Sequence, residues 1–396
     1  MDLYQSLSNS AARQPIRCID MHTTGEPTRI VLNGFPELRG TLNEQREEYR
    51  KQYDRYRRTT MLEPRGHDGM YGALLVRDSE LIRSGEAHIA VLYLHNEGYS
   101  TICGHAAIAL GRFLVDTHDL DNFPQRKDLI FDPVTSVTTV NLHTPCGINK
   151  LSVPSTNGGA RSDPTRPVSF LSVPSFVGVL DMVVEIPEAD WWPQLTATGR
   201  TSVRVDLSYG GAWYCMVNVD QLGFVGGLGK LNTKAFDAVT QIIKRQITSG
   251  DLVKQVAVPF DVEWYLYRIM IVDKSLGDDD GESGLCFFAD QQIDRSPAGG
   301  CVASRMALAY ARGHPLHQSV KFNSFISNEF GGRGAFTGTS VQEVEIAGGH
   351  GISSKGVVVR VEGQAFYTGA MTFIIEPEDH INDGFAVKDI EMASTR

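Results

Sequence analysis

The sequence predicts an α/β protein built from two domains that share one plan. Its 396 residues are enough for two domains of ordinary size, each with its own core. Residues 90–115 and 285–312 both read as an apolar strand, a polar loop, a short glycine-containing elbow and an alanine-rich helix. A repeat spaced by about 195 residues indicates two similar domains facing each other, whereas the alternative is a chance likeness between two strand–helix junctions.

In the first half, residues 16–33 predict a strand, a turn at Gly25 and a second strand. Residues 41–58 predict a helix, because leucine and tyrosines recur at helical spacing while the charged residues form the opposite, solvated face. A strand is expected over 87–94 and a mostly buried helix over 104–115, where the residues are almost all apolar or small. The first repeated unit therefore ends in a buried helix.

The second half repeats this alternation of strands and helices. Apolar runs predict strands at 202–208 and 284–289, and helices are expected at about 232–248 and 299–312. The last helix begins with the glycine pair 299–300 after Ala298, as the helix at 104–115 begins with Gly104 after Cys103. The two elbows are therefore equivalent, and a ligand is expected between the two helix N-termini.

Composition excludes several classes of function. Lys and Arg number 37 against 47 Asp and Glu, a formal net charge of −10, which argues against nucleic acid or an anionic membrane as the main partner. The hydrophobic share is 42%, typical of a folded protein. The sequence has no run of 18 apolar residues and no apolar signal segment near its start. We therefore expect a cytoplasmic protein.

Cys103 differs from the other cysteines by its position. The six cysteines are scattered without a C-x-x-C pair, so neither a disulfide framework nor a zinc site is expected. Cys103 stands at the start of the 104–115 helix, where backbone N–H groups and the helix dipole stabilise a thiolate. Such a thiolate can act as a nucleophile or a general base, and the alternative is a buried structural thiol. His105 could hydrogen-bond a ligand or shape the field around the sulfur.

Several long and unusual motifs point to one family. They are HTTGEPTRIV (22–31), EPRGHDGMYGALLV (63–76), ICGHAAIALGRFLVD (102–116), TPCG (144–147), VPSFV (173–177), VDLSYGGAWY (205–214), FFADQQIDRSP (287–297) and GQAFYTGAMTFIIEPEDHINDGF (363–385). With these motifs the chain resembles the proline racemase family almost from end to end. GHAAIALGRF, TPCG and RMALAY are typical of its trans-3-hydroxy-L-proline dehydratase branch.

The resemblance implies a fold similar to diaminopimelate epimerase, with two pseudo-symmetric α/β domains, each a curled sheet or barrel around a central helix. We expect the first domain over 1–180, completed by about 360–396, and the second over 181–360. The family implies no metal, nicotinamide or pyridoxal cofactor. Its partner is a small amino-acid substrate, and a homodimer is expected from the resemblance alone.

The resemblance also implies catalytic positions. In the racemases two cysteines flank the substrate Cα, and in the dehydratases the second is typically threonine. Here the first position is Cys103, the implied proton acceptor, and the second is Ala298, which has no proton to give or take. Ala298 is either the natural residue or an introduced substitution. Cys301, three residues on, is read as a helix-start thiol rather than a substitute base.

Substrate-binding positions follow from the same motifs. The resemblance implies amide contacts to an anion from both elbows, an acceptor for the ring ammonium in DRSP, and an aromatic residue near the substrate ring: Gly104, His105, Gly299, Gly300, Asp294 and Tyr71. Asp294 could instead be a turn or helix-cap residue, and Tyr71 could be a core aromatic.

The expected activity is a cofactor-independent lyase reaction. Cys103 would remove the α-proton of trans-3-hydroxy-L-proline, water would leave, and the enamine would tautomerise to Δ1-pyrroline-2-carboxylate. One alternative is a one-base epimerase or racemase-like enzyme acting on another proline-type amino acid. The other is a non-catalytic binding protein of the same fold, which the alanine at 298 keeps open.

Overall fold

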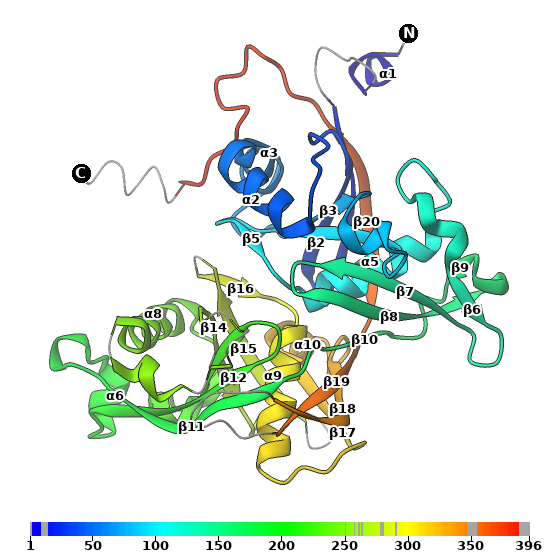
Figure 1. The fold of residues 1–396 in the computed structure, drawn as a ribbon. Helices are drawn as coiled ribbons and strands as arrows, with labels where there is room; N and C mark the ends of the chain where they lie inside the picture. Colours follow the sequence, from blue (N-terminus) through cyan, green and yellow to red (C-terminus); the bar gives the residue numbers. More distant parts are fainter. Residues whose placement is uncertain are drawn as a thin grey trace. The chain divides into compact units, whose positions relative to one another are not determined.

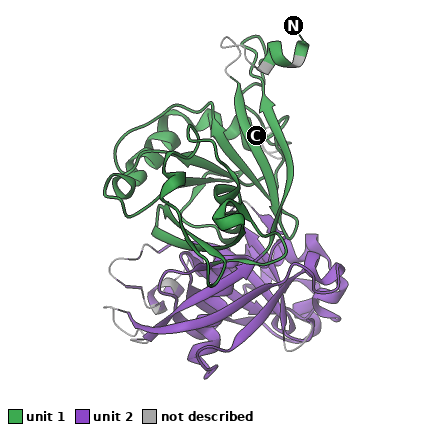
Figure 2. Cartoon of the chain, turned by 90° about the vertical axis from the view of Figure 1, so that its right-hand side faces the viewer, with its two compact units in different colours: residues 1–169, 364–396 green, residues 170–363 purple. Residues whose placement is uncertain are grey.

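The computed structural model describes residues 2–8, 15–249, 251–256, 258–259, 262, 264–277, 281–289, 291–346 and 355–387. The chain forms two compact units (Figure 2), unit 1 of residues 1–169 and 364–396 and unit 2 of residues 170–363. It passes from unit 1 to unit 2 within the short strand β10 (Val168–Leu171) and returns just after β19 (Lys355–Gly363).

Unit 1 is built on a mixed sheet with the strand order β20-β1-β2-β3-β4-β7-β8. Its main strands are β1 (Ile16–Thr23), β2 (Glu26–Asn33), β3 (Gly72–Val76), β4 (Ile89–Leu94), β7 (Val137–Thr144), β8 (Gly147–Thr156) and β20 (Ala365–Phe373). Shorter strands pair at their ends: β5 (Tyr99–Ser100), β6 (Ile130–Asp132) and β9 (Arg161–Ser162). The helices are α1 (Leu3–Ser8), α2 (Leu42–Gln52), α3 (Asp54–Met61), α4 (Glu80–Arg83) and α5 (Gly104–Asp116).

Unit 2 carries a mixed sheet with the order β11-β12-β13-β14-β15-β17-β18-β19. Its strands are β11 (Phe176–Glu185), β12 (Ser202–Tyr209), β13 (Trp213–Asn218), β14 (Leu266–Asp273), β15 (Glu282–Phe288), β16 (Gln292–Asp294), β17 (Ser319–Ser324), β18 (Phe336–Glu345) and β19. The helices are α6 (Pro193–Ala197), α7 (Val219–Leu222), α8 (Thr233–Ser249), α9 (Gly299–Ala311) and α10 (Phe325–Glu329).

The two sheets have the same topology. From β20 to β8 in unit 1, successive pairs run antiparallel, antiparallel, parallel, antiparallel, parallel and antiparallel. The pairs from β11 to β18 in unit 2 follow the same succession. In both, a short strand and then a long helix follow the fifth strand, as β5 and α5 or as β16 and α9. The predicted α/β fold with a repeated plan is confirmed.

Each long helix that follows an elbow lies against the strands of its own unit (Figure 1). In unit 1, α5 packs on β1, β2, β7, β8 and β20, and in unit 2, α9 packs on β11, β12, β18 and β19. Both helices are rich in alanine and glycine, and nearly all of their residues are buried. Small side chains let a helix approach the sheet closely on several sides, so the N-terminus of each helix is fixed by its whole surroundings.

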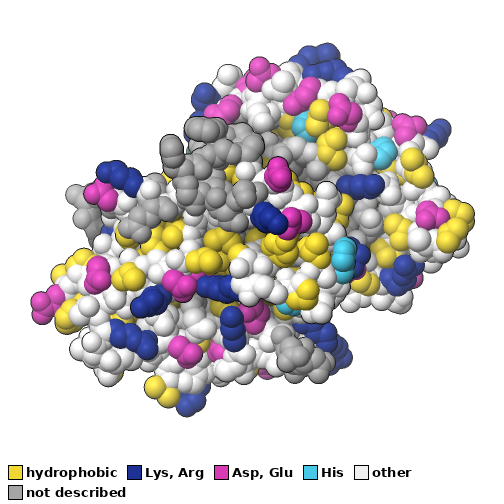
Figure 3. Space-filling model, turned by 60° about the horizontal axis from the view of Figure 1, so that its bottom comes forward, with side chains coloured by type: hydrophobic (Ala, Val, Ile, Leu, Met, Phe, Trp, Pro, Cys, Tyr) yellow, Lys and Arg dark blue, Asp and Glu magenta, His cyan; other side chains and the backbone are white. Residues whose placement is uncertain are grey.

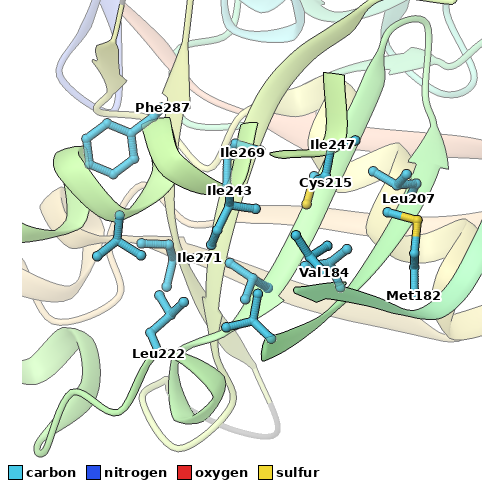
Figure 4. Close-up of a cluster of buried hydrophobic side chains, with 14 of the residues drawn as sticks. Met182, Val184, Leu207, Cys215, Leu222, Ile243, Ile247, Ile269, Ile271 and Phe287 are labelled. Atoms are coloured by element: carbon cyan, nitrogen blue, oxygen red, sulfur yellow. The ribbon is translucent and has the colours of Figure 1, made fainter. Parts of the chain in front are cut away.

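Separate hydrophobic cores stabilise the units. In unit 1, apolar residues of β1, β3 and β4 pack with those of α2 and α3. In unit 2, a larger cluster joins β11 to β15 with α8, whose apolar stripe contributes Ile243 and Ile247 (Figure 4). Each unit therefore has the buried apolar surface that an independent core requires.

The region predicted as one helix over 41–58 forms two. Helix α2 begins at a capping box of Thr41 and Glu44, and it ends at Tyr53, whose backbone is not helical (φ −127°, ψ 18°). Helix α3 then directs the buried Arg57 at the carbonyl oxygens of His95 and Asn96, 2.8 and 2.6 Å away. The break gives α3 its own direction and lets it hold the loop after β4.

The surface carries mixed charge. Acidic and basic side chains are interspersed with apolar ones over the face shown in Figure 3. Among the described residues, none of the helices is both long and apolar enough to cross a bilayer.

Candidate active site

The elbow of unit 1 places Cys103 at the start of α5. The preceding strand β4 is buried at every residue, which fixes the direction of the chain entering the loop. Cys103 is the N-cap residue of α5, with extended backbone (φ −149°, ψ 117°), and its side chain makes no capping hydrogen bond. The thiol is 2% exposed. The sulfur therefore lies at the N-terminal end of the helix dipole, beside the N–H groups of the first helical turn, in a largely dry environment.

His105 lies directly against this sulfur. Cys103 Sγ is 3.3 Å from Nδ1 and 3.5 Å from Nε2 of the imidazole. The hydroxyl of Thr23, at the end of β1, donates to the carbonyl oxygen of His105 at 2.9 Å. This hydrogen bond connects the first turn of α5 to the β1–β2 hairpin. It therefore fixes the backbone that carries the thiol and the imidazole.

Tyr71 packs against the imidazole. Its ring meets the His105 ring edge-on, with centroids 4.7 Å apart and an interplanar angle of 73°. The Tyr71 hydroxyl hydrogen-bonds the hydroxyl of Ser100, and the side chain is fully buried. Tyr71 is thus a core aromatic that holds the imidazole; its predicted contact with a substrate ring stays a prediction.

Glu26 is a site residue that sequence reasoning missed. It is the first residue of β2, and its side chain is fully buried. One of its oxygens and a ring nitrogen of His105 lie within 4.8 Å of each other. The signal was available in HTTGEPTRIV, where an acidic residue begins a largely apolar strand. A carboxylate, an imidazole and a thiol thus follow one another in unit 1.

Tyr93 adds a neutral hydroxyl to the surroundings of Cys103. Burial raises the pKa of Tyr93 well above 10, and the thiols of Cys103 and Cys146 raise the pKa further. Its hydroxyl is buried without a hydrogen-bond partner among the described residues. Tyr93 therefore remains protonated at physiological pH.

The elbow of unit 2 places Ala298 at the start of α9. Ala298 is fully buried, and its backbone is in the left-handed region (φ 62°, ψ 89°), which L residues other than Asn, Asp and His seldom adopt. At residue 300, a Cβ would overlap the hydroxyl of Tyr214 and lie 3.1 Å from the carbonyl oxygen of Gly210. Gly300 is therefore required for close packing of α9 on the turn after β12.

Asp294 organises the approach to this elbow. Its Oδ1 accepts from the backbone N–H of Ser296 at 2.9 Å and from the Ser296 hydroxyl at 2.7 Å. The same hydroxyl accepts from the N–H of Ala298 at 3.1 Å. Asp294 thus has the turn-forming role that was the alternative to substrate binding. A carboxylate has about four acceptor positions, so this role does not exhaust it.

Arg268 on β14 is the counter-charge of Asp294. Its Nη1 donates to Asp294 Oδ2 at 2.9 Å, and both side chains are almost fully buried. The guanidinium also lies 4.5 Å from the ring centre of Phe288. A buried, paired carboxylate of this kind is held in one orientation. Neither Arg268 nor Ser296 was singled out from the sequence, since neither residue type stands out without its spatial partner.

Two further cysteines are unsuited to act as bases. Burial, with a smaller effect of the neighbouring Cys286, raises the pKa of the Cys301 thiol well above its usual range. Burial also raises the pKa of Cys18 to about 12. Both therefore remain thiols at neutral pH, and for Cys301 this agrees with the interpretation of a helix-start thiol.

The structure distributes the predicted site residues over the two elbows. It brings Tyr71, Cys103, Gly104 and His105 together in unit 1, and Asp294, Ala298, Gly299 and Gly300 together in unit 2. Each unit therefore carries a helix N-terminus with polar groups around it.

Comparison with known proteins gives full-length matches. The family described as proline racemase matches residues 18–386. The trans-3-hydroxy-L-proline dehydratase of Homo sapiens is 39% identical over 379 residues, which cover 93% of this chain and 94% of that protein. A protein of the same name from Colwellia psychrerythraea is 31% identical over 383 residues, covering 94% and 93% of the two chains.

Solved structures agree on the fold. A probable proline racemase from Agrobacterium radiobacter K84, with bound carbonate, superposes with a TM-score of 0.74 at 23% identity and covers 95% of this chain and 97% of its own. A hydroxyproline epimerase from Agrobacterium vitis, with bound trans-4-hydroxy-L-proline, gives a TM-score of 0.73 at 22% identity, with coverage of 95% and 97%.

Proposed function

The chain belongs to the proline racemase family, and on that premise we propose that it dehydrates trans-3-hydroxy-L-proline to Δ1-pyrroline-2-carboxylate. Relatives named for this activity match it along more than nine-tenths of its length. The observation that carries the proposal is the position of Cys103, a buried thiol at a helix N-terminus with an imidazole 3.3 Å away.

In the proposed reaction, the Cys103 thiolate takes the α-proton. The helix N-terminus favours the anionic sulfur, and His105 is within reach to exchange a proton with it. The Cα–H electrons form a Cα=C3 double bond, the C3–O bond breaks, and the hydroxyl leaves as water with one proton. The enamine then tautomerises to the imine. Every step is a proton transfer or an elimination, so atoms and charge balance without an oxidant or reductant.

We assign substrate binding to the predicted positions in both units. The N–H groups of Gly104 and His105, and those of Gly299 and Gly300, would hold the carboxylate, because helix N-termini favour anions. Asp294 would accept from the ring ammonium at its remaining acceptor position.

Ala298 limits which reactions are feasible. Racemisation needs a proton carrier on each face of Cα, and a methyl group supplies none. Elimination needs one base and a proton for the leaving hydroxyl, which water can deliver. The proposal is therefore dehydration rather than inversion. A binding protein without turnover is the second candidate, and Ala298 is the observation that favours it.

A panel of proline and hydroxyproline stereoisomers in deuterated water distinguishes these functions. Proton NMR would follow pyrroline-2-carboxylate, optical inversion and α-deuteration together, with Cys103→Ser as the matched control. We expect the pyrroline product from trans-3-hydroxy-L-proline and no inversion of either proline enantiomer. Inversion would establish an epimerase, and a lack of both product and α-exchange would establish the binding protein.

A further inference from the structure

A second cavity lies within unit 2, beside the later turns of α9. It has a volume of about 410 Å³, in the range of small-molecule sites. Its walls come from β12 to β15, β17 and the α9 residues Arg305, Leu308, Ala309 and Arg312. With a rise of 1.5 Å per residue, Arg305 and Arg312 lie roughly 9 and 20 Å from Gly299 along the axis of α9. The cavity is therefore separate from the Ala298 elbow, and the proposed function does not use it.

Arg305 lines this cavity and carries two terminal guanidinium nitrogens without a hydrogen-bond partner among the described residues. Its side chain is 2% exposed, and its Nε donates to Glu282 Oε1 at 2.5 Å. Its Nη1 and Nη2 atoms are buried and have no hydrogen-bond partner among the described residues. The guanidinium lies 4.5 Å from the ring centre of Phe322. Glu282 and Phe322 thus hold the guanidinium in place, while its two terminal nitrogens lack an acceptor within the described part of the chain.

The surrounding charges favour one negative group. Four basic side chains line the cavity against three acidic ones: Arg204, Lys274, Arg305 and Arg312 against Asp181, Asp206 and Glu282. Arg312 is paired with Asp206 at 2.8 Å, and Arg305 with Glu282. Within the described part of the chain, neither Arg204 nor Lys274 has an ion-pair partner. The lining therefore has an excess of positive charge, which would attract a single bound anion.

The uncharged part of the wall is mostly apolar, with Asn218 and Gln221 as its polar members. Val205, Met216, Val272, Leu308, Val320 and Phe322 line the cavity, and most of them are buried. An inorganic anion would leave these walls without a partner, whereas a hydrocarbon chain would cover them and remove apolar surface from water.

We propose that this cavity is a binding site for a small organic monocarboxylate with an apolar body. The carboxylate accepts two parallel hydrogen bonds from Nη1 and Nη2 of Arg305, the bidentate geometry that suits a guanidinium. The hydrocarbon part lies against Val272, Leu308 and Phe322, and Lys274 contributes charge at the mouth.

Methyl NMR of methionine-labelled protein tests the site directly. The chain has 10 methionines, and Met216 lies in the cavity wall, so its signal is assigned by its loss in Met216→Leu. Hexanoate is the probe, and hexanamide is its neutral counterpart of the same shape. We expect hexanoate to shift the Met216 signal and hexanamide to leave it in place. No shift with hexanoate, or an equal shift with hexanamide, would overturn the proposal.

Variants locate the binding. Ala309→Trp fills the cavity from α9 and should abolish the hexanoate shift. Arg305→Lys keeps the positive charge but loses the two parallel N–H donors of the guanidinium, so we expect at least about tenfold weaker binding of hexanoate. Lys274→Gln should weaken binding severalfold, whereas Lys230→Gln, an exposed cation of unit 2 that does not line the cavity, should not change it.

Two outcomes would contradict this location. The first is an unchanged affinity for hexanoate in the Ala309→Trp variant. This variant removes no buried charge, so it still tests the site if the Arg305→Lys variant does not fold. The second is displacement of hexanoate from Met216 by pyrrole-2-carboxylate, the flat anion expected at the elbows. Persistence of the Met216 shift in its presence supports a separate site.

Discussion

Ala298 combines an inert side chain with a demanding backbone. A left-handed conformation costs an L residue roughly 1–2 kcal/mol, and such outliers persist where the surrounding structure holds them. Here Ser296 accepts from the Ala298 N–H, and Ser296 is held in turn by Asp294. The sequence indicated that residue 298 has no proton carrier, but the backbone conformation depends on tertiary contacts and had no sequence signal.

Substitution of Ala298 tests the second position. A hydroxyl introduced by Ala298→Thr should raise the dehydration rate of trans-3-hydroxy-L-proline. General acid assistance is typically worth about 10²–10⁴-fold, and we expect less here because a β-branched residue is strained at positive φ. Ala298→Gly is the matched control, since it relieves the backbone without supplying a proton. Equal kcat values for the threonine and glycine variants would remove residue 298 from proton transfer.

The Arg268–Asp294 pair should contribute strongly to stability. Removing one partner of a buried ion pair costs about 3–5 kcal/mol, so Arg268→Met should shift the urea unfolding midpoint clearly downward. Arg312→Gln breaks the exposed pair with Asp206 and should cost no more than about 1 kcal/mol. Similar midpoints for the two variants would show that Asp294 does not depend on Arg268.

At the scale of elements, the elbow helices were predictable and their surroundings were not. The apolar and small residues of α5 and α9 predict buried helices, and the structure places them within a residue or two of the expected bounds. The break at Tyr53 was missed, because the apolar spacing of 41–58 continues across it. After the break, α3 is held by the tertiary contact of Arg57 with the loop after β4, which the sequence pattern does not show.

Gly300 should tolerate no side chain. In Gly300→Ala the new methyl group would meet Tyr214 and the backbone of Gly210, and such overpacking costs typically about 1–3 kcal/mol. At Gly229 a Cβ would have no heavy atom within 4 Å, so Gly229→Ala serves as the control. Thermal unfolding followed by circular dichroism measures both variants, and an unchanged melting temperature for Gly300→Ala would show that α9 can shift to accommodate the methyl group.

At the scale of the whole molecule, the repeat extends further than the sequence indicated. Sequence similarity covered only the strand, elbow and helix around 90–115 and 285–312. The structure adds neighbouring strands of each sheet, so that β20-β1-β2-β3 and β11-β12-β13-β14 correspond in order and direction. Strand pairing constrains only the alternation of buried positions, not residue identity, and the outer parts of the repeat therefore left no readable pattern.

Ligand binding should involve residues of both units. Pyrrole-2-carboxylate, flat and anionic, should raise the melting temperature; a ligand at 100 times its Kd stabilises by about 2.7 kcal/mol. We expect His105→Gln in unit 1 and Asp294→Asn in unit 2 each to reduce this ligand-induced shift, and Lys230→Gln to preserve it. A full shift in either of the first two variants would remove that residue from substrate binding.

Turnover of trans-3-hydroxy-L-proline by Cys103→Ser measures the central claim most directly. Serine keeps the size of the side chain but is a far weaker base at neutral pH, so nearly all pyrroline-2-carboxylate formation should be lost while the melting temperature stays close to that of the unmodified protein. Cys146→Ser, at the half-buried thiol of the same unit, should retain activity. If the folded Cys103→Ser protein keeps more than about a tenth of the original kcat, a loss below ~1.4 kcal/mol in transition-state stabilisation, then Cys103 is not the base.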